Sequence, residues 1–233
     1  MKIIAIESSA ATASVAYAAD GRIVGEYTTD HKKTHSQTLL PMLEELMRMT
    51  EAKPEEIDAV AVAAGPGSYT GLRIGAALAK GLAEGWQKKI LPVSTLEGLA
   101  YRLRETDALV CPIMDARRGQ VYSGIWRFTA EAGQRRSETV AEGAALLLTE
   151  QIERLNQLGE AVIFLGDGVD VHAAQIAETC KVPYRFAMPE NRYQSAAAVA
   201  ARAEDLGEKA LIDPAAFAPE YLRQSQAERE LNR

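Results

Sequence analysis

The segment GPGSYTGLR, residues 65–73, has the composition of a turn that leads into a helix. Its Gly65 and Gly67 permit backbone conformations that other residues rarely adopt. Because N–H groups at the start of a helix attract anions, the segment is a candidate phosphate cradle. It lacks the Lys of a Walker A loop and the third glycine of a dinucleotide-binding fingerprint. A tight connection from strand to helix explains the glycines without a ligand, and we favour that interpretation.

Polar residues follow two further apolar runs, at corresponding positions in the two halves of the chain. Glu7 and Ser8 end the first run, and Asp115 ends a similar run in the second half. Such carboxylates can position a metal-bound phosphate, and Gly166 can border an adenine. Short polar residues also complete the hydrogen bonds of turns. We interpret these four residues and the two glycines above as vestiges of a nucleotide-binding cleft, and we expect no cofactor.

His31 and His35 have the i, i+4 spacing of a metal-binding pair. A helix is predicted to begin near Thr34, which places His31 outside it, and no H-E-x-x-H motif or third ligand is nearby. The sequence also lacks the G-x-S-x-G motif of a serine nucleophile. We therefore expect neither a metal site nor a catalytic residue.

Hydrophobic periodicity and turn residues predict two successive sets of strands and helices. In the first half we expect strands at residues 2–9, 12–19, 22–29, 58–64 and 90–93, and helices at 35–50, 71–86 and 95–104. In the second half we expect strands at 108–114, 120–128, 137–140, 161–165 and 184–187, and helices at 144–158 and 195–206, with a short helix after residue 168. Each half has the order βββαβα, followed by a strand and a helix.

This repeated order predicts an α/β protein with duplicated βββαβα-type lobes. It resembles the actin, sugar-kinase and Hsp70 ATPase fold, in which two such lobes enclose a nucleotide. We assign residues 1–106 to an N-terminal lobe with partner-binding helices and residues 107–218 to a C-terminal lobe. We expect a C-terminal helix to cross back to the first lobe. Residues 219–233 form a polar tail that can also pack on the first lobe.

The composition is that of an ordinary globular chain, with 47% hydrophobic and 25% charged residues among 233 and a net charge of −6. No basic patch is visible, so nucleic-acid binding without a partner is disfavoured.

Two separated cysteines indicate a reducing compartment. The first apolar run is too short for a signal peptide, and no run is long enough to span a membrane. We expect a cytoplasmic protein.

Two predicted helices, at 35–50 and 71–86, carry more apolar surface than one sheet can cover. A second interface explains this surplus, and small residues on the second helix allow close packing. Complete burial of both helices explains it equally well. The candidate interface residues are Leu39, Met42, Leu43, Leu46, Met47, Ile74, Leu78, Ala79 and Leu82.

The chain resembles the bacterial TsaB (YeaZ) family in five segments: IAIESSAATASVAY, HSQTLLPMLEEL, IDAVAVAAGPGSYTGLRIGAALAKGLA, PVSTLEGLA and MDARRGQVYSG. The match covers nearly all of the first lobe and extends to about Gly124. The resemblance implies a non-catalytic protein that binds the catalytic paralogue TsaD and the ATPase TsaE. Together these proteins transfer a threonylcarbamoyl group to N6 of adenosine 37 in tRNAs that read codons beginning with A. The tRNA would be contacted only through the complex.

The resemblance also implies that the helices at 35–50 and 71–86 contact TsaD, or form a homodimer when TsaD is absent. The catalytic paralogue has two metal-binding histidines in a segment like P-V-N-H-x-E-G-H. Thr95 and Leu99 stand in their places here, and neither can replace an imidazole ligand. Glu7 also stands where the family commonly has Asp. The alternative function is a stand-alone ATP-dependent phosphotransferase or ATPase, with Glu7 and Asp115 on a metal and residues 65–71 near phosphate.

Overall fold

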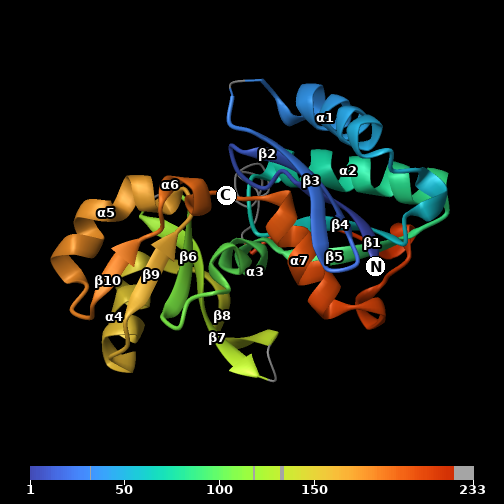
Figure 1. Ribbon diagram of the computed structural model, residues 1–233. Helices are drawn as coiled ribbons and strands as arrows, with labels where there is room; N and C mark the ends of the chain where they lie inside the picture. Colours follow the sequence, from blue (N-terminus) through green and yellow to red (C-terminus); the bar gives the residue numbers. More distant parts are fainter. Residues whose placement is uncertain (32, 118, 132–133, 223–233) are drawn as a thin grey trace. The chain divides into compact units, whose positions relative to one another are not determined.

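The computed structural model describes residues 1–31, 33–117, 119–131 and 134–222 (Figure 1). The chain divides into two compact units. The first unit comprises Met1–Gly98 and the chain from Gln194 onward, and the second comprises Leu99–Tyr193. The expected boundary after residue 106 is therefore wrong, because the second unit already begins at Leu99. The assignment of residues 194–218 to the second lobe is also wrong, because these residues pack on the first unit.

The first unit is built on a five-stranded sheet in the order β3-β2-β1-β4-β5. The strands are β1 (Lys2–Glu7), β2 (Ala13–Ala19), β3 (Arg22–Thr29), β4 (Ala59–Gly65) and β5 (Lys89–Ser94). β1 pairs antiparallel with β2 and parallel with β4. Every residue of β4 is buried, which explains its uninterrupted apolar sequence AVAVAAG. Asp20 and Gly21 both have positive φ, as a tight turn between β2 and β3 requires.

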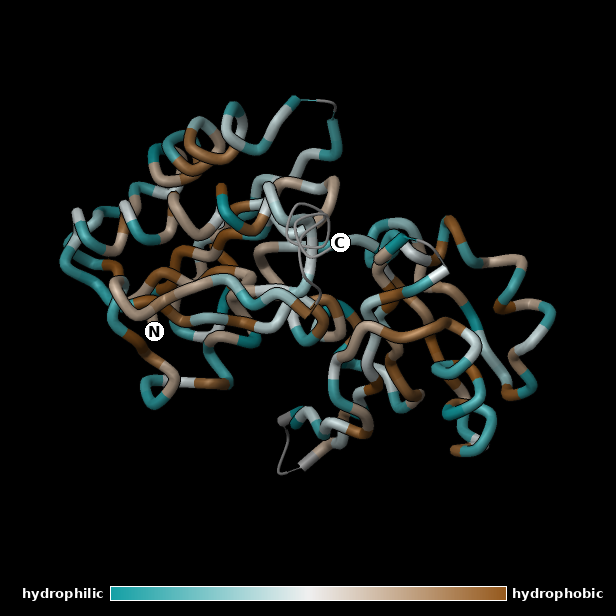
Figure 2. The backbone as a smooth tube through the Cα atoms, turned by 180° about the vertical axis from the view of Figure 1, so that it is seen from behind, coloured by the Kyte–Doolittle hydropathy of each residue, from teal (hydrophilic) through white to brown (hydrophobic). Residues whose placement is uncertain are grey.

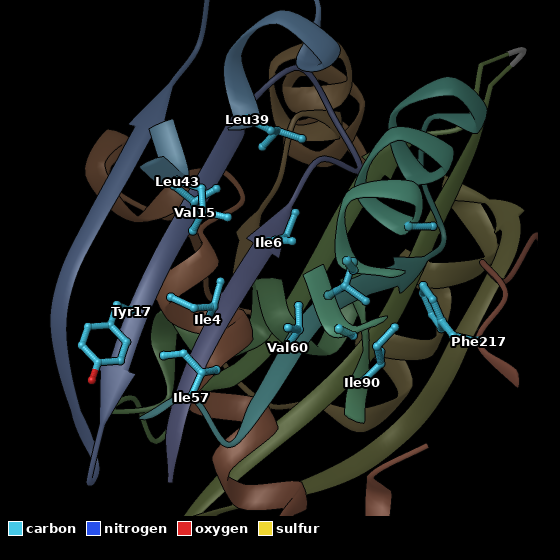
Figure 3. Close-up of a cluster of buried hydrophobic side chains, with 14 of the residues drawn as sticks. Ile4, Ile6, Val15, Tyr17, Leu39, Leu43, Ile57, Val60, Ile90 and Phe217 are labelled. Carbon is cyan, nitrogen blue, oxygen red and sulfur yellow. The ribbon is translucent and has the colours of Figure 1, made fainter. Parts of the chain in front are cut away.

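Two helices, α1 (His35–Thr50) and α2 (Tyr69–Trp86), pack on one face of this sheet. Figure 3 shows the side chains buried between them and the strands. Helix α7 (Ala196–Leu206) packs on other residues of the same strands, and the small side chains Ala196, Ala200 and Ala203 bring it close. Helix α7, which was expected in the second half of the fold, therefore belongs to the first unit. The short helix α3 (Thr95–Ala100) and a 3-10 turn, Tyr101–Leu103, replace the single helix expected at 95–104.

The chain after α7 runs back along the first unit. Ile212 forms a backbone bridge with Ile90 of β5, with N···O distances of 2.9 and 3.0 Å. Phe217 is buried in the same core as α1 and α2 (Figure 3). The N–H of Glu220 donates to the carbonyl of Ala64 at 2.6 Å. The described part of the polar tail, residues 219–222, therefore contacts the first unit, whereas residues 223–233 lie outside the described residues.

The second unit has a five-stranded sheet in the order β10-β9-β6-β7-β8. Its strands are β6 (Leu109–Asp115), β7 (Gln120–Glu131), β8 (Gln134–Leu147), β9 (Val162–Leu165) and β10 (Tyr184–Phe186), and its helices are α4 (Leu148–Leu158), α5 (Gly168–Thr179) and α6 (Pro189–Arg192). Strands β6 to β10 take the places that β1 to β5 have in the first sheet. The duplicated α/β fold of the actin, sugar-kinase and Hsp70 ATPase class is thereby confirmed.

Hydrophobic residues concentrate on the strands inside each unit (Figure 2).

The expected start of the helix at 144–158 is wrong: α4 begins at Leu148 rather than at residue 144. Residues 144–147 instead extend β8, where Leu147 pairs with Gln120 of β7. In the part of the chain that the structure describes, no helix is long and apolar enough to cross a membrane.

Candidate functional site

Glu7 is the last residue of β1, and its side chain is only 1% exposed. Its Oε1 accepts a 2.6 Å hydrogen bond from the N–H of Ser9. Burial raises the pKa of the Glu7 carboxyl to about 7, against the opposing effect of hydrogen bonds from Ser9 and Ser8. A carboxyl that is partly protonated at neutral pH is a weaker ligand for a metal-bound phosphate than an ionised one.

The turn after β1 packs directly on the glycine-rich segment. The Ser8 hydroxyl donates to the carbonyl of Gly71 at 2.9 Å, and the N–H of Ser68 donates to the carbonyl of Ser9 at 2.7 Å. A Cβ atom on Gly67 would lie closer than 3.0 Å to the carbonyl oxygen of Ser9. A Cβ atom on Gly71 would likewise lie closer than 3.0 Å to the carbonyl oxygen of Ser8. These glycines permit a close backbone approach, which favours a packed connection over a phosphate cradle.

The start of α2 already has protein partners for two of its N–H groups. Ser68 caps the helix through its hydroxyl, which accepts from the N–H of Gly71 at 3.2 Å. Its own N–H is occupied by Ser9, as described above. An anion at this helix end would have to displace these hydrogen bonds.

The outer side of the glycine-rich segment is covered by the C-terminal chain. Gly65 has a φ of +127°, and a Cβ atom there would clash with the carbonyl of Glu220. The guanidinium of Arg73 stacks 4.1 Å from the ring centre of Tyr69 and donates from Nε to the Tyr221 hydroxyl at 3.1 Å. The two tyrosine rings are 5.1 Å apart. Sequence reasoning missed this cluster, because nothing in a linear reading joins Tyr221 to Tyr69.

In the second unit, Asp115 ends β6 and Gly166 follows β9. Oδ1 of Asp115 accepts from the N–H of Arg117 at 2.8 Å. Gly166 has a φ of +102°, and a Cβ atom there would meet the carbonyl of Ile113. Because β6 and β9 are parallel neighbours, the residues that follow them lie together. Asp167 and His172 lie beside these residues, and neither is among the six predicted cleft residues.

The six predicted cleft residues fall into two groups, one in each unit. The first unit holds four of them: Glu7, Ser8, Gly65 and Gly67. There the turn after β1 contacts the glycine-rich segment, which in turn contacts the C-terminal chain. Asp115 and Gly166 lie together in the second unit. The first group lies at the ends of the parallel neighbours β1 and β4, and the second lies at the ends of the parallel neighbours β6 and β9.

His35, one of the two histidines with i, i+4 spacing, has a partner within the protein. Nε2 of His35 lies 2.7 Å from the carbonyl oxygen of Ala10, which ties the start of α1 to the turn after β1. Across the described residues, no group of three or more His, Cys, Asp or Glu side chains is arranged to hold a metal ion. Thr95 and Leu99, which stand in the histidine positions of the paralogue's motif, are 0% and 2% exposed.

Four of the residues expected at a partner surface are in the core instead. Leu39, Leu43, Leu46 and Ala79 are at most 2% exposed and pack against the first sheet. They face inward because they form the stripes of α1 and α2 that cover the strands. The other five candidates are only partly buried at the edge of this core: Met42, Met47, Ile74, Leu78 and Leu82. Leu40 and Met49 of α1 and Tyr69 of α2 are exposed, and they are not among the nine candidate interface residues.

These features define a member of the actin, sugar-kinase and Hsp70 ATPase class with closely packed, partly covered strand ends. A family model described as TsaD, tRNA N6-adenosine threonylcarbamoyltransferase, matches residues 22–231. The Bacillus subtilis tRNA threonylcarbamoyladenosine biosynthesis protein TsaB is 35% identical over 98% of this chain and 96% of its own. Escherichia coli TsaB is 33% identical over 72% of each chain. The structure of YeaZ from Pseudomonas aeruginosa has a TM-score of 0.74 and 26% identity, covering 95% of this chain and 99% of its own. The chain belongs to the TsaB (YeaZ) family.

Proposed function

We propose that this chain is a non-catalytic subunit in the biosynthesis of threonylcarbamoyladenosine in tRNA, and that it acts by binding and activating TsaD together with TsaE. The observation that carries the proposal is the 35% identity over nearly the whole chain to a relative named for this pathway. In this role the chain contacts tRNA only through the complex and needs no cofactor of its own. It works in the cytoplasm, where tRNA is modified.

The absence of a catalytic role is supported by the segment that carries histidines in the paralogue. Thr95 and Leu99 are buried, and neither offers an imidazole nitrogen. Glu97, which the two motifs share, is bound to Arg202 of α7 rather than directed at a ligand. The chemistry of transfer is therefore assigned to TsaD.

We assign the TsaD-binding surface to α1 and α2. Ile74, Leu78 and Leu82 recur every four residues along one flank of α2 and are only partly buried. Exposed Leu40 and Met49 extend the apolar surface on α1. Large apolar side chains that remain accessible on adjacent helices are typical of a protein interface. The same surface would form a homodimer when TsaD is absent.

The test is a reconstituted modification reaction. Purified TsaD and TsaE are supplied with threonylcarbamoyl-adenylate and tRNA, with and without this chain, and ATP hydrolysis by this chain alone is measured in parallel. We expect tRNA modification only when the chain is present, and no ATP turnover by the chain alone. Turnover of ATP by the isolated chain, without any effect on tRNA, would refute the proposal.

A pair of variants tests the surface. Leu78→Glu places a charge on the apolar flank of α2, and Ala174→Glu places the same charge at an exposed position of α5 in the other unit. A disrupted interface anchor costs about 2 kcal/mol or more, so we expect roughly thirtyfold weaker TsaD binding for Leu78→Glu. Ala174→Glu should bind normally. Equal binding by both variants, with both folded, would exclude this surface.

A further inference from the structure

Three titratable side chains meet at one edge of the second sheet: Asp115, Asp167 and His172. Asp115 ends β6, Asp167 lies just after β9, and His172 lies in the second turn of α5. β6 and β9 run parallel in adjacent positions, so their carboxyl ends share this edge. Open α/β sheets bind ligands outside the carboxyl ends of such strands.

Two polar atoms of this cluster are buried without a hydrogen-bond partner. His172 is 8% exposed, and its Nε2 lies 3.9 Å from Oδ1 of Asp115, too far for a hydrogen bond. Oδ1 of Asp167 is also buried and unpartnered. Buried polar atoms are nearly always paired, so both atoms are available to hydrogen-bond a ligand.

The cluster has a surplus of hydrogen-bond acceptors and negative charge. Burial, and then the negative charge of Asp115, raises the pKa of Asp167 to about 6, although backbone N–H groups oppose the change. Arg192, on the neighbouring α6, is committed to Asp170 and to the carbonyl of Ala187. Among the residues that the structure describes, Arg117 contacts Asp115 through its backbone N–H, which donates to Oδ1 at 2.8 Å.

We propose that Asp115, Asp167 and His172 bind an organic cation with several N–H donors, namely the guanidinium or ammonium end of a ligand. A guanidinium presents several N–H donors in a fixed fork that suits carboxylate oxygens, and an imidazole nitrogen can accept a further hydrogen bond. Direct coordination of a metal is a poorer fit, because no group of three potential ligands among the described residues is placed to hold one. The three residues lie in the second unit, and none of them is among those assigned above to TsaD binding.

The test is a titration of the full chain with N-acetyl-arginine amide, followed through the NMR signals of the His172 ring. The chain has three histidines, and His172→Gln identifies the signal. We expect a saturable shift whose affinity falls at least tenfold in Asp115→Asn and in Asp167→Asn. Glu178→Gln, which removes an exposed carboxylate from the far end of α5, is the matched control and should bind unchanged. The uncharged N-acetyl-norleucine amide should give no shift.

A second arm separates a small molecule from a protein side chain. Purified TsaD replaces the arginine probe; a His172 shift that Asp115→Asn abolishes identifies a side chain of the partner as the cation. Micromolar binding of the probe with no response to TsaD identifies a free metabolite. Absence of a saturable shift with the probe would overturn the proposal, as would an equal shift with the norleucine compound. Broadening of the His172 signal by Mn²⁺ at lower concentrations than the probe requires would also overturn it, in favour of a metal.

Discussion

The carboxylate of Glu97 receives two hydrogen bonds from the guanidinium of Arg202, from Nε at 3.0 Å and from Nη2 at 3.2 Å. Glu97 lies in α3 and Arg202 in α7, and both side chains are mostly buried. The pair fastens α7 beside Gly98, where the chain leaves the first unit. A bidentate pair with this geometry is stronger than a single charged hydrogen bond. Glu97 thus has a structural role that does not depend on the missing histidines.

Removing either partner of this pair should destabilise the first unit. Glu97→Ala and Arg202→Ala each leave a mostly buried charge without its counterpart, and we expect a loss of about 2 kcal/mol in unfolding free energy for each. The double variant should lose clearly less than the sum, because the second change removes a charge that is already unpaired. Urea denaturation of the four proteins measures the coupling. Strictly additive losses would show that the two groups do not interact.

Two glycines of α2 should respond oppositely to the same substitution. In Gly71→Ala the new Cβ meets the backbone carbonyl of Ser8, so the turn after β1 must move and the protein should lose more than about 2 kcal/mol of stability. In Gly81→Ala nothing lies within 4 Å of the new Cβ, and alanine favours the helix by about 1 kcal/mol. Thermal denaturation should therefore show a lower Tm for the first variant and an equal or higher Tm for the second.

The stability of the protein should depend on pH through Glu7. The pKa of this carboxyl is raised in the folded protein from 4.5 to about 7, so the folded state binds the proton more tightly than the unfolded state. Its contribution is complete below about pH 4.5 and is lost as the pH rises through 7, with a slope of at most about 1.4 kcal/mol per pH unit.

Glu7→Gln removes this titration and keeps the shape of the side chain. Urea denaturation between pH 5 and 8 should show that the stability of the unmodified protein falls relative to that of Glu7→Gln as the pH rises. Parallel profiles for the two proteins would mean that the Glu7 carboxyl ionises at its ordinary pKa in spite of its burial.

Helix α1 should distinguish core from surface at two nearby leucines. Leu43 is 1% exposed, whereas Leu40 is 45% exposed. We expect Leu43→Ala to cost about 2–5 kcal/mol, because it leaves a cavity against the sheet. Leu40→Ala should cost less than about 0.5 kcal/mol and should instead weaken TsaD binding. Equal losses of stability in denaturant would show that α1 is rotated relative to the arrangement described above.

Hydrophobic periodicity predicted most strands and helices, because the buried apolar residues of each element recur along the sequence at the period of a strand or of a helix. It failed where distant pairing decided the outcome. The apolar run at 144–148 is compatible with either a strand or a helix, and Leu147 is a strand residue because Gln120 of β7 pairs with it. The apolar stripe of α7 likewise shows that the helix is buried, but not which sheet it covers. Helix α7 was therefore assigned to the wrong unit.

The candidate site was predictable only where it follows the ends of strands. Glu7 and Asp115 were found because each ends an apolar run. His172 was missed because a single histidine within a helix gives no sign of the carboxylates that fold beside it. The inward direction of Leu39 and Leu43 was also undetermined, since an apolar stripe is the same whether it covers a sheet or a partner.

The continuity of Leu99–Tyr193 has a consequence for the order of events during translation. The whole second unit leaves the ribosome before α7, which packs against Ile3, Ala5 and Leu91 of the first sheet. At typical rates of synthesis, that face of the sheet waits on the order of 10 seconds for its helix. During this time the nascent first unit exposes an apolar surface that the finished protein conceals, and we expect this face to be prone to aggregation and to chaperone binding until α7 is made.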